Sequence, residues 1–292
     1  MFGPMLSFLL ASPLNLPAQV AAVVTAEVTL EQEQFLPGEA LPVAVRITNR
    51  SGQTLRLGGD PDWLTFSVES RDGFIVGKND EVPVTGEFVL ESGNRATRRV
   101  DLAPYFNLAQ PGRYHIIAQV HIKEWDRQIA SDAKSFDVTQ GLKLWSEEFG
   151  VPPPAGATNP APEVRKYILQ QANYLRGQLK LYLRLTDATE SKVFKVFPLG
   201  PIVSFGEPEK QLDNRSNLHV LYQTGARSFA YTVINPDGDV VLRQTYDYAT
   251  SRPRLRANQE GDFAIVGGAR RVTANDVPPP KPEAGDGPTP KP

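Results

Sequence analysis

The C-terminal quarter of the sequence carries a run of basic side chains whose spacing suits ligand binding. Arg252, Arg254 and Arg256 alternate with residues of low polarity. Because side chains alternate across an extended strand, the three guanidinium groups would form a basic ridge on one face. Such a ridge is suited to a phosphate, an acidic glycan or the carboxylates of a partner, and the alternative interpretation is a solvated strand face.

Tyrosines precede this ridge and would add surfaces for stacking. Tyr246 and Tyr248 lie just upstream of Arg252. Aromatic rings stack on sugars, but in strands they also serve core and cross-strand packing, and both interpretations stay open. The candidate ligand-binding residues are therefore Arg252, Arg254, Arg256, Tyr246 and Tyr248.

Histidine is the side chain most often used as a catalytic base, and the sequence holds 3 of them. His115 and His121 lie on one face of a predicted strand, separated by about 20 Å at roughly 3.3 Å per residue. They therefore cannot share a metal ion or a proton relay. His219 lies in another predicted strand, where we interpret it as a residue of the pairing face.

The composition removes several classes of chemistry. There is no cysteine, which excludes disulfides, thiolate zinc sites, iron–sulfur clusters and cysteine nucleophiles. The sequence also lacks the glycine-rich phosphate loops, the nucleophile elbow and the HExxH zinc motif. We therefore predict no catalytic residue, no metal site and no cofactor.

Closely spaced carboxylates occur at three places: Asp60 with Asp62, Asp80 with Glu81, and Asp237 with Asp239. Two such groups in a loop can bind Ca²⁺, and two facing carboxylates can hydrolyse a glycosidic bond. The same residues are favoured in tight turns, and we adopt the turn interpretation.

The charge balance limits the partners. The formal net charge is -2, from 31 basic and 33 acidic residues. No global field would attract nucleic acid or an anionic membrane, so we predict no nucleic-acid partner.

Residues 1–26 resemble a secretory signal peptide. A short apolar run over residues 5–10 is followed by small residues, with cleavage sites after Ala22 or Ala26. No Lys or Arg precedes the apolar run, which departs from the usual pattern. We expect export to the periplasm, cell surface or medium, and no transmembrane span.

Residues 27–140 show short alternating strands between turn signals such as Leu36-Pro37-Gly38-Glu39, and this pattern indicates an antiparallel sandwich. The longest is the strand after Pro111-Gly112, where Tyr114 and every second residue up to Ile122 should face the core. Together, "FLPGEALPVAVRITNRSG" and "LAPYFNLAQPGRYHIIAQV" resemble the immunoglobulin-like sandwiches of exported bacterial proteins. In that resemblance Tyr114 is the corner tyrosine whose hydroxyl bonds to nearby backbone.

Residues 141–162 are predicted to be a connection between two domains. Residues 151–162 are rich in proline, which removes backbone donors and favours extended geometry. Residues 141–150 would form a short strap or helix before that linker. For residues 163–175 the pattern leaves an amphipathic helix and a strand as equal alternatives.

Residues 163–276 are predicted to be a second β domain with internal repeats. Units beginning near Leu179, Leu218 and Phe263 each combine a polar turn with an apolar strand. They resemble the blade-like meanders of propellers, although three units are too few to close a ring. The open edges would pack on the first domain, on a second copy of the chain or on another protein.

The predicted fold class is thus all-β, an immunoglobulin-like sandwich followed by a blade-like meander. Residues 277–292 hold 7 of the 26 prolines and are predicted to be a disordered tail. The sequence predicts a non-catalytic binding or scaffolding protein of an envelope, with a protein or glycan as partner. The alternative is a carbohydrate-active enzyme, or its accessory domain, that uses Asp237 and Asp239.

Overall fold

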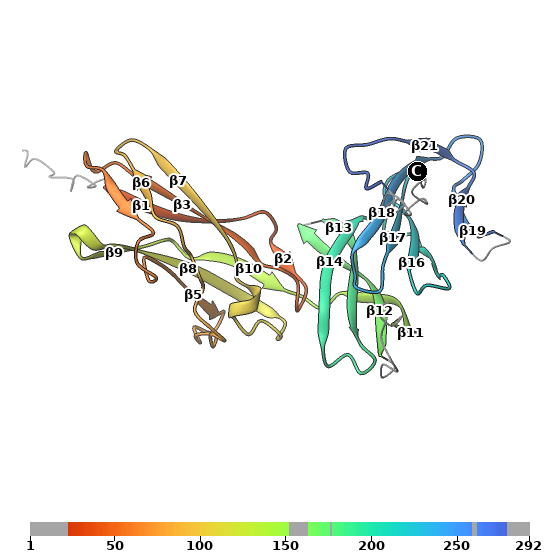
Figure 1. The fold of residues 1–292 in the computed structure, drawn as a ribbon, viewed down its shortest axis with the longest axis horizontal. Helices are drawn as coiled ribbons and strands as arrows, with labels where there is room; N and C mark the ends of the chain where they lie inside the picture. Colours follow the sequence, from red (N-terminus) through yellow and green to blue (C-terminus); the bar gives the residue numbers. More distant parts are fainter. Residues whose placement is uncertain (1–22, 152–162, 176, 259–261, 279–292) are drawn as a thin grey trace, which may run out of the picture.

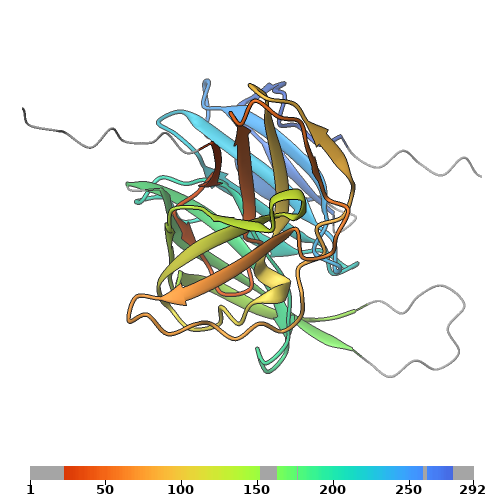
Figure 2. The same ribbon diagram turned by 90° about the vertical axis from the view of Figure 1, so that its left-hand side faces the viewer.

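The computed structural model describes residues 23–151, 163–175, 177–258 and 262–278. This part of the chain is all-β and contains no α-helix, which confirms the predicted fold class. Figure 1 shows two β-rich halves placed end to end, and in Figure 2 the first half lies in front of the second.

The first half is built from two larger sheets and a small one. One sheet has the order β1 (Val24–Leu30), β3 (Pro42–Asn49), β7 (Arg95–Asp101). The other has the order β2 (Gln34–Phe35), β10 (Lys134–Val138), β8 (Gly112–Ile122), β5 (Leu64–Ser70), with β9 (Arg127–Ala130) also on β8. A third pair is β4 (Leu55–Leu57) with β6 (Phe88–Leu90). β2 pairs with β10 in parallel, and the other pairs are antiparallel.

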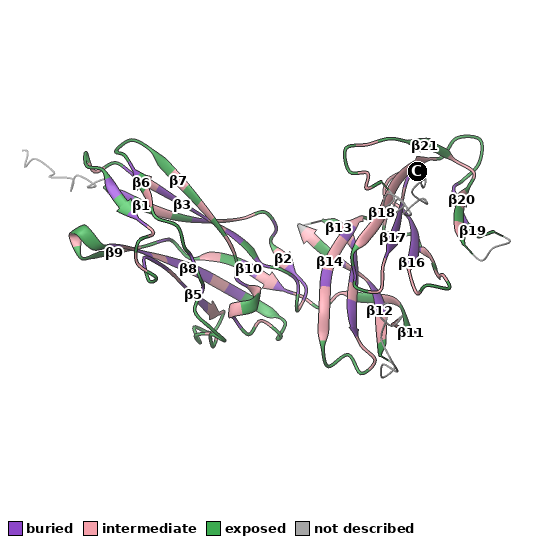
Figure 3. Cartoon of the chain, in the orientation of Figure 1, coloured by how far each residue is buried: buried purple, intermediate pink, exposed green. Residues whose placement is uncertain are grey.

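One hydrophobic core lies between the two larger sheets. In β8 the residues predicted to face inward are buried: Tyr114, Ile116, Ala118, Val120 and Ile122. They pack in one cluster with residues of the opposite sheet such as Val43, Val45 and Ile47. Figure 3 shows the buried positions along these strands and the exposed ones on β7 and the loops.

Two polar contacts fix the aromatic members of this core. The Tyr114 hydroxyl donates to the carbonyl of Gln110 at 2.7 Å, which confirms the predicted bond to nearby backbone. The buried Trp63 indole donates to the carbonyl of Val84 at 2.8 Å. The phenol of Tyr114 and the indole of Trp63 therefore each keep a partner for the polar atom that burial removes from water.

The second half contains two antiparallel meanders and a hairpin. The first meander is β11 (Leu142–Gly150), β12 (Val164–Leu175), β13 (Gln178–Asp187), β14 (Val193–Pro201). The second is β15 (Glu209–Leu212), β16 (Leu218–Gln223), β17 (Ser228–Ile234), β18 (Val240–Asp247), with β21 (Ala269–Arg271) added to β18. The hairpin is β19 (Arg254–Ala257) with β20 (Phe263–Val266).

The connection predicted for residues 141–162 is corrected by this topology. Residues 142–150 form β11, not a strap or helix, and β11 pairs along its length with β12. The proline-rich residues 152–162 lie outside the described residues, and they connect two neighbouring strands of one sheet instead of two domains. For residues 163–175 the strand alternative is confirmed by β12, and the helix is wrong.

The structure also bears on three further predictions: the repeat units, the signal peptide and the tail. The three repeat units begin in β13, β16 and β20, which lie in three different sheets. Most of the predicted signal peptide lies outside the described residues, but Val24 to Ala26 already belong to β1. Of the predicted tail, Val277 forms two backbone hydrogen bonds with Arg243 of β18, and residues 279–292 lie outside the description.

The two halves meet where the turn at residues 36–39 contacts the face of β12 to β14. The Glu39 N–H donates to the carbonyl of Leu36 at 3.0 Å, and Gly38 has φ +83°, as the predicted Pro-Gly turn requires. Leu36 packs in a buried cluster with three residues of the second half: Ala172, Tyr182 and Val196. We call this contact the joint.

Hydrogen bonds reinforce the joint. The Arg184 guanidinium donates to the carbonyl of Pro37 at 2.8 Å. The Glu33 N–H donates to the carbonyl of Tyr174 at 3.3 Å. We expected the first domain to cover an open edge of the second domain, but the joint covers a face of β12 to β14 instead.

A matched pair of glycines tests whether the joint sets the arrangement of the halves. Gly38 and Gly52 share a positive φ, +83° and +80°, so valine at either position costs at least about 1–2 kcal/mol of backbone strain. Only at Gly38 would the new Cβ lie 3.2 Å from Cγ1 of Val193, whereas Gly52 has open space. We expect Gly38→Val, but not Gly52→Val, to raise the radius of gyration measured by small-angle X-ray scattering. Identical scattering from the two variants would show that the joint does not hold the halves together.

Candidate functional site

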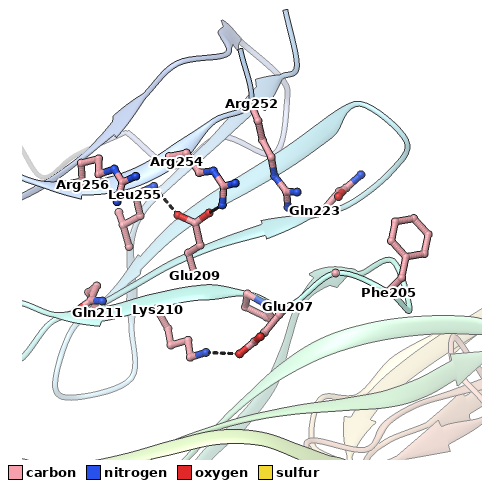
Figure 4. Close-up of a pocket in the computed structure, with 12 residues that line it drawn as sticks. Phe205, Glu207, Glu209, Lys210, Gln211, Gln223, Arg252, Arg254, Leu255 and Arg256 are labelled. Atoms are coloured by element: carbon pink, nitrogen blue, oxygen red, sulfur yellow. Dashed lines mark hydrogen bonds and ion pairs between the residues drawn. The ribbon is translucent and has the colours of Figure 1, made fainter.

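The predicted basic ridge borders a hollow on the surface of the second half. This groove lies between β15 and the β19–β20 hairpin, and it has a cavity volume of about 640 Å³. Its lining comes from three segments: Phe205 to Gln211, Gln223, and Arg252 with Arg254 to Arg256. Figure 4 shows Arg252 and Gln223 toward one end and Arg256 and Gln211 toward the other.

The alternation predicted for the ridge is present. Pro253 and Leu255 are buried, while Arg252, Arg254 and Arg256 are exposed. Leu255 enters an apolar cluster on the outer face of the second meander, with Phe229 and Tyr231 among its neighbours. The buried residues therefore anchor the hairpin, and the same strand turns its guanidinium groups toward the groove.

A carboxylate at the floor of the groove holds the hairpin in place. Oε1 of Glu209 accepts a hydrogen bond from Nη1 of Arg254 at 2.8 Å, and Oε2 accepts one from the Leu255 N–H at 2.8 Å. Both oxygens of one side chain thus bind consecutive residues of β19. We call this contact the Glu209 clasp.

The three arginines of the ridge differ in how they are neutralised. Arg254 is paired with Glu209. Arg252 lies over the ring of Phe229, 5.1 Å from its centroid, and within the described ranges neither Arg252 nor Arg256 has a carboxylate partner. Among the described residues, the ends of the ridge therefore carry two guanidinium groups that can bind an anion.

A smaller hollow of about 360 Å³ adjoins the groove. It shares Gln223 and Arg252 with the groove and adds Arg227 and Tyr248. Tyr248 is 43% exposed, and the guanidinium of Arg227 lies 5.5 Å from its ring centroid. The structure thus brings Tyr248 and the ridge together on one surface.

Tyr246 lies apart from that surface. It packs against the outer apolar cluster, and its hydroxyl donates to Oε1 of Gln244 at 2.8 Å. Tyr246 lines neither hollow, so it is not part of the candidate site.

The neighbouring arginines of β21 are also outside it, because each has a carboxylate. Arg270 bonds to Asp276, and Arg271 bonds to Asp247 at 2.7 Å. The hydrogen bond from Arg271 lowers the pKa of Asp247, as expected for a carboxylate that is stabilised by a cation.

His219 takes part in a buried hydrogen-bonded chain. Its Nδ1 lies 2.7 Å from the Tyr231 hydroxyl and its Nε2 lies 3.2 Å from Oδ2 of Asp213. Burial raises the pKa of Tyr231 well above its ordinary value, so the phenol stays neutral. The ring of Phe263 lies against the imidazole, with 5.1 Å between centroids. His219 thus connects three elements: a hydrogen bond joins β16 to β17, and the ring contact with Phe263 joins β16 to the hairpin.

The other two histidines lie on the outward face of β8, as predicted. His115 bonds to the Ser135 hydroxyl at 3.0 Å, and His121 lies 3.7 Å from a carboxylate oxygen of Asp126. Each of the two histidines thus contacts a different residue.

The closely spaced carboxylates form turns and ion pairs. Asp237 and Asp239 belong to one turn, where Oδ1 of Asn235 accepts hydrogen bonds from the N–H groups of both. Asp237 pairs with Arg165, and Asp239 pairs with Lys195. Both carboxylates are therefore committed to stabilising the turn and its neighbours.

The two remaining carboxylate pairs, Asp60 with Asp62 and Asp80 with Glu81, also contribute ion pairs. Asp60 bonds to Lys123 at 2.8 Å, and Glu81 pairs with Lys78 at 3.0 Å. In the part of the chain that the structure describes, no group of three or more potential ligands could hold a metal ion. Nor is any helix there long and apolar enough to cross a bilayer.

Several residues of the groove were not identified from the sequence. Phe205, which is 81% exposed, stands alone in a loop, and Gln211 and Gln223 lie in unremarkable strand positions. Glu209 lies 46 residues before Leu255, whose N–H it binds. An alternating arginine run marks one wall of such a groove, but nothing local marks the opposite wall.

Comparison with known proteins adds little to this geometry. No protein-family model matches the chain, and no curated protein matches it. Among solved structures, the sporulation control protein Spo0M from Bacillus subtilis is similar over 61% of this chain and 91% of its own, at 10% identity and a TM-score of 0.31. A likeness of this size supports no argument about function.

The Glu209 clasp generates a direct test. Glu209→Gln keeps the size of the side chain but places an amide against one of the two donors, so the hairpin should open more often. We expect the Leu255 amide to exchange with deuterium about tenfold faster, equivalent to roughly 1.4 kcal/mol. The control is Glu207→Gln, because Glu207 lines the same groove and bonds to Lys210 alone. Equal exchange in the two variants would contradict the clasp.

Proposed function

We propose that this protein is a non-catalytic binding protein that holds an anionic ligand in the groove between β15 and the β19–β20 hairpin. The observation that carries the proposal is the pair of guanidinium groups, Arg252 and Arg256, that have no carboxylate partner within the described residues. Arginine binds carboxylate and phosphate groups through a planar fork of donors and remains charged at any physiological pH.

The lining of the groove supports this choice. Four cationic groups and two carboxylates line it, which leaves an excess of two positive charges. The chain as a whole has a net charge of -2. The groove is thus a local positive region on a nearly neutral protein, which suits selective binding of one ligand better than general attraction to polyanions.

We also infer the finer fold of each half. The orders β1-β3-β7 and β10-β8-β5 support an immunoglobulin-like sandwich, as does the hydroxyl of Tyr114 at the start of β8. The consecutive strands of the two meanders support the blade-like description. These assignments describe folds and imply no activity.

Export is the proposed location, and it rests on residues 1–26 of the sequence. A binding protein of the periplasm, cell surface or medium needs no cysteine if its core is held by packing alone. The edges β15 and β21 of the second meander remain candidates for pairing with a second copy or a partner protein.

The binding proposal is tested by charge-neutral substitution of the two free arginines. The Arg252→Gln/Arg256→Gln variant should elute from columns of immobilised polyanions at a lower salt concentration than the natural chain, because two ionic contacts are lost. A panel of resins that carry carboxylate, sulfate and phosphate polymers would be used.

The matched control for this experiment has the same net charge. Arg99 and Arg127 are exposed in the first half and take part in no ion pair within the described ranges. Arg99→Gln/Arg127→Gln should elute with the natural chain. If both double variants elute identically on every resin, the groove is not the binding site and the proposed function fails.

The burial of Val24 predicts where a signal peptidase would cut. Val24 is 3% exposed and pairs with Asn49, so cleavage after Ala26 would remove core residues of β1. Cleavage after Ala22 leaves β1 complete. We expect mass spectrometry of the exported protein to find Val23 as the first residue. A first residue of Glu27 would contradict this assignment, and an intact Met1 would contradict export.

A further inference from the structure

We infer that the ligand of the groove is an acidic polysaccharide whose sugars carry isolated carboxylates, a polyuronate. This inference rests on the proposed anion-binding function and narrows it to one class of ligand. It is carried by the distribution of charge along the groove, by the neutral polar groups between the charges, and by two exposed aromatic rings.

The positive charges are spread out. Arg252 and Arg256 lie about 13 Å apart along the chain, at roughly 3.3 Å per residue of extended backbone. A compact phosphate or sulfate is bound best by several donors that converge on one point, whereas Arg252 and Arg256 lie toward opposite ends of the groove (Figure 4). The spacing instead suits an extended ligand that meets one guanidinium at each of two separated positions.

Negative charges lie between the positive ones. Glu209 occupies the floor between the two free arginines, and Glu207 lines the same groove (Figure 4). A hydrogen bond from Lys210 lowers the pKa of Glu207, so this carboxylate is charged at neutral pH. A polymer of high charge density, such as polyphosphate, must place negative charge beside these two carboxylates, whereas a chain with one carboxylate per sugar can place neutral hydroxyls there.

Neutral hydrogen-bonding groups are present at both ends. The amide nitrogen of Gln223 donates to the carbonyls of Gly225 and Ala226, so the orientation of the amide is fixed at this end of the groove. Gln211 is exposed and lines the other end. Amides of this kind donate to and accept from sugar hydroxyls, which an acidic peptide would supply only in some of its side chains.

Aromatic rings frame the end near Arg252. Phe205 is 81% exposed and lines the groove, and Tyr248 is 43% exposed and lines the adjoining hollow. An exposed phenylalanine that lines a polar groove contributes no core packing, but its face can stack on the apolar face of a sugar ring. Arginine beside an exposed ring is therefore the pattern expected for a sugar that carries a carboxylate.

The test is an isothermal titration of the full chain with four probes at equal concentration of monomer: oligogalacturonate, the same oligosaccharide as its neutral methyl ester, poly-glutamate and inorganic polyphosphate. We expect oligogalacturonate to bind at least tenfold more tightly than each of the others. Arg252→Gln and Arg256→Gln should each weaken that binding about tenfold.

The aromatic contact distinguishes a sugar from any other anion. Phe205→Ala should weaken oligogalacturonate binding about three- to tenfold, without effect on the residual binding of polyphosphate. The matched control is Phe74→Ala, because Phe74 is 74% exposed on the first half and lies outside the groove. It should bind as the natural chain does.

The outcomes separate the inference from the function on which it rests. Poly-glutamate or polyphosphate could bind as tightly as oligogalacturonate and still depend on Arg252 and Arg256. In that case the assignment of a polyuronate ligand is wrong, whereas the proposed anion-binding function is supported. An unchanged affinity of Phe205→Ala for oligogalacturonate would also contradict the assignment of a sugar ligand. If no probe binds in an arginine-dependent way, both the inference and the proposed function fail.

Discussion

The sheet formed by β15 to β18 must bury both of its faces, and the candidate site exists because of this constraint. Residues Leu218 to Tyr222 of β16 are buried at five consecutive positions, so alternating side chains are covered on each side. Leu218, Val220 and Tyr222 pack toward the first meander. The opposite face, with Leu221, needs a second cover, and the β19–β20 hairpin provides it through Leu255. A short hairpin cannot cover the whole face, and the groove forms where it ends beside β15.

Local alternation made much of this architecture predictable. The inward residues of β8 and the outward arginines of the 252–256 segment follow from a period of two, which depends only on neighbouring residues. Pairing depends on distant residues: the sequence of residues 141–150 predicts a strap or helix, whereas residues 142–150 form β11 because β12 pairs with them. The Glu209 clasp likewise depends on a distant segment, because the Leu255 N–H that Glu209 binds lies 46 residues later in the sequence.

The turn at residues 36–39 shows how one local signal can carry a second role. Proline and glycine at this position were sufficient to predict the turn, and the φ of Gly38 agrees. Nothing in that signal indicates that the Pro37 carbonyl accepts a hydrogen bond from Arg184, or that Leu36 is buried by another half of the chain. Prediction from sequence therefore located the element but missed the surface that it supports, because burial there depends on two domains together.

The state of the carboxyl groups favours binding over glycoside hydrolysis. A general acid needs a carboxyl whose pKa is raised toward neutrality and that can reach the substrate. Within the described residues burial raises the pKa of Glu39, but this side chain is 6% exposed and accepts hydrogen bonds from Gln32 and Leu36. In the groove, Lys210 lowers the pKa of Glu207 and both oxygens of Glu209 are occupied. Both carboxylates of the groove thus serve as hydrogen-bond acceptors for neighbouring residues, which agrees with the binding role proposed for the groove.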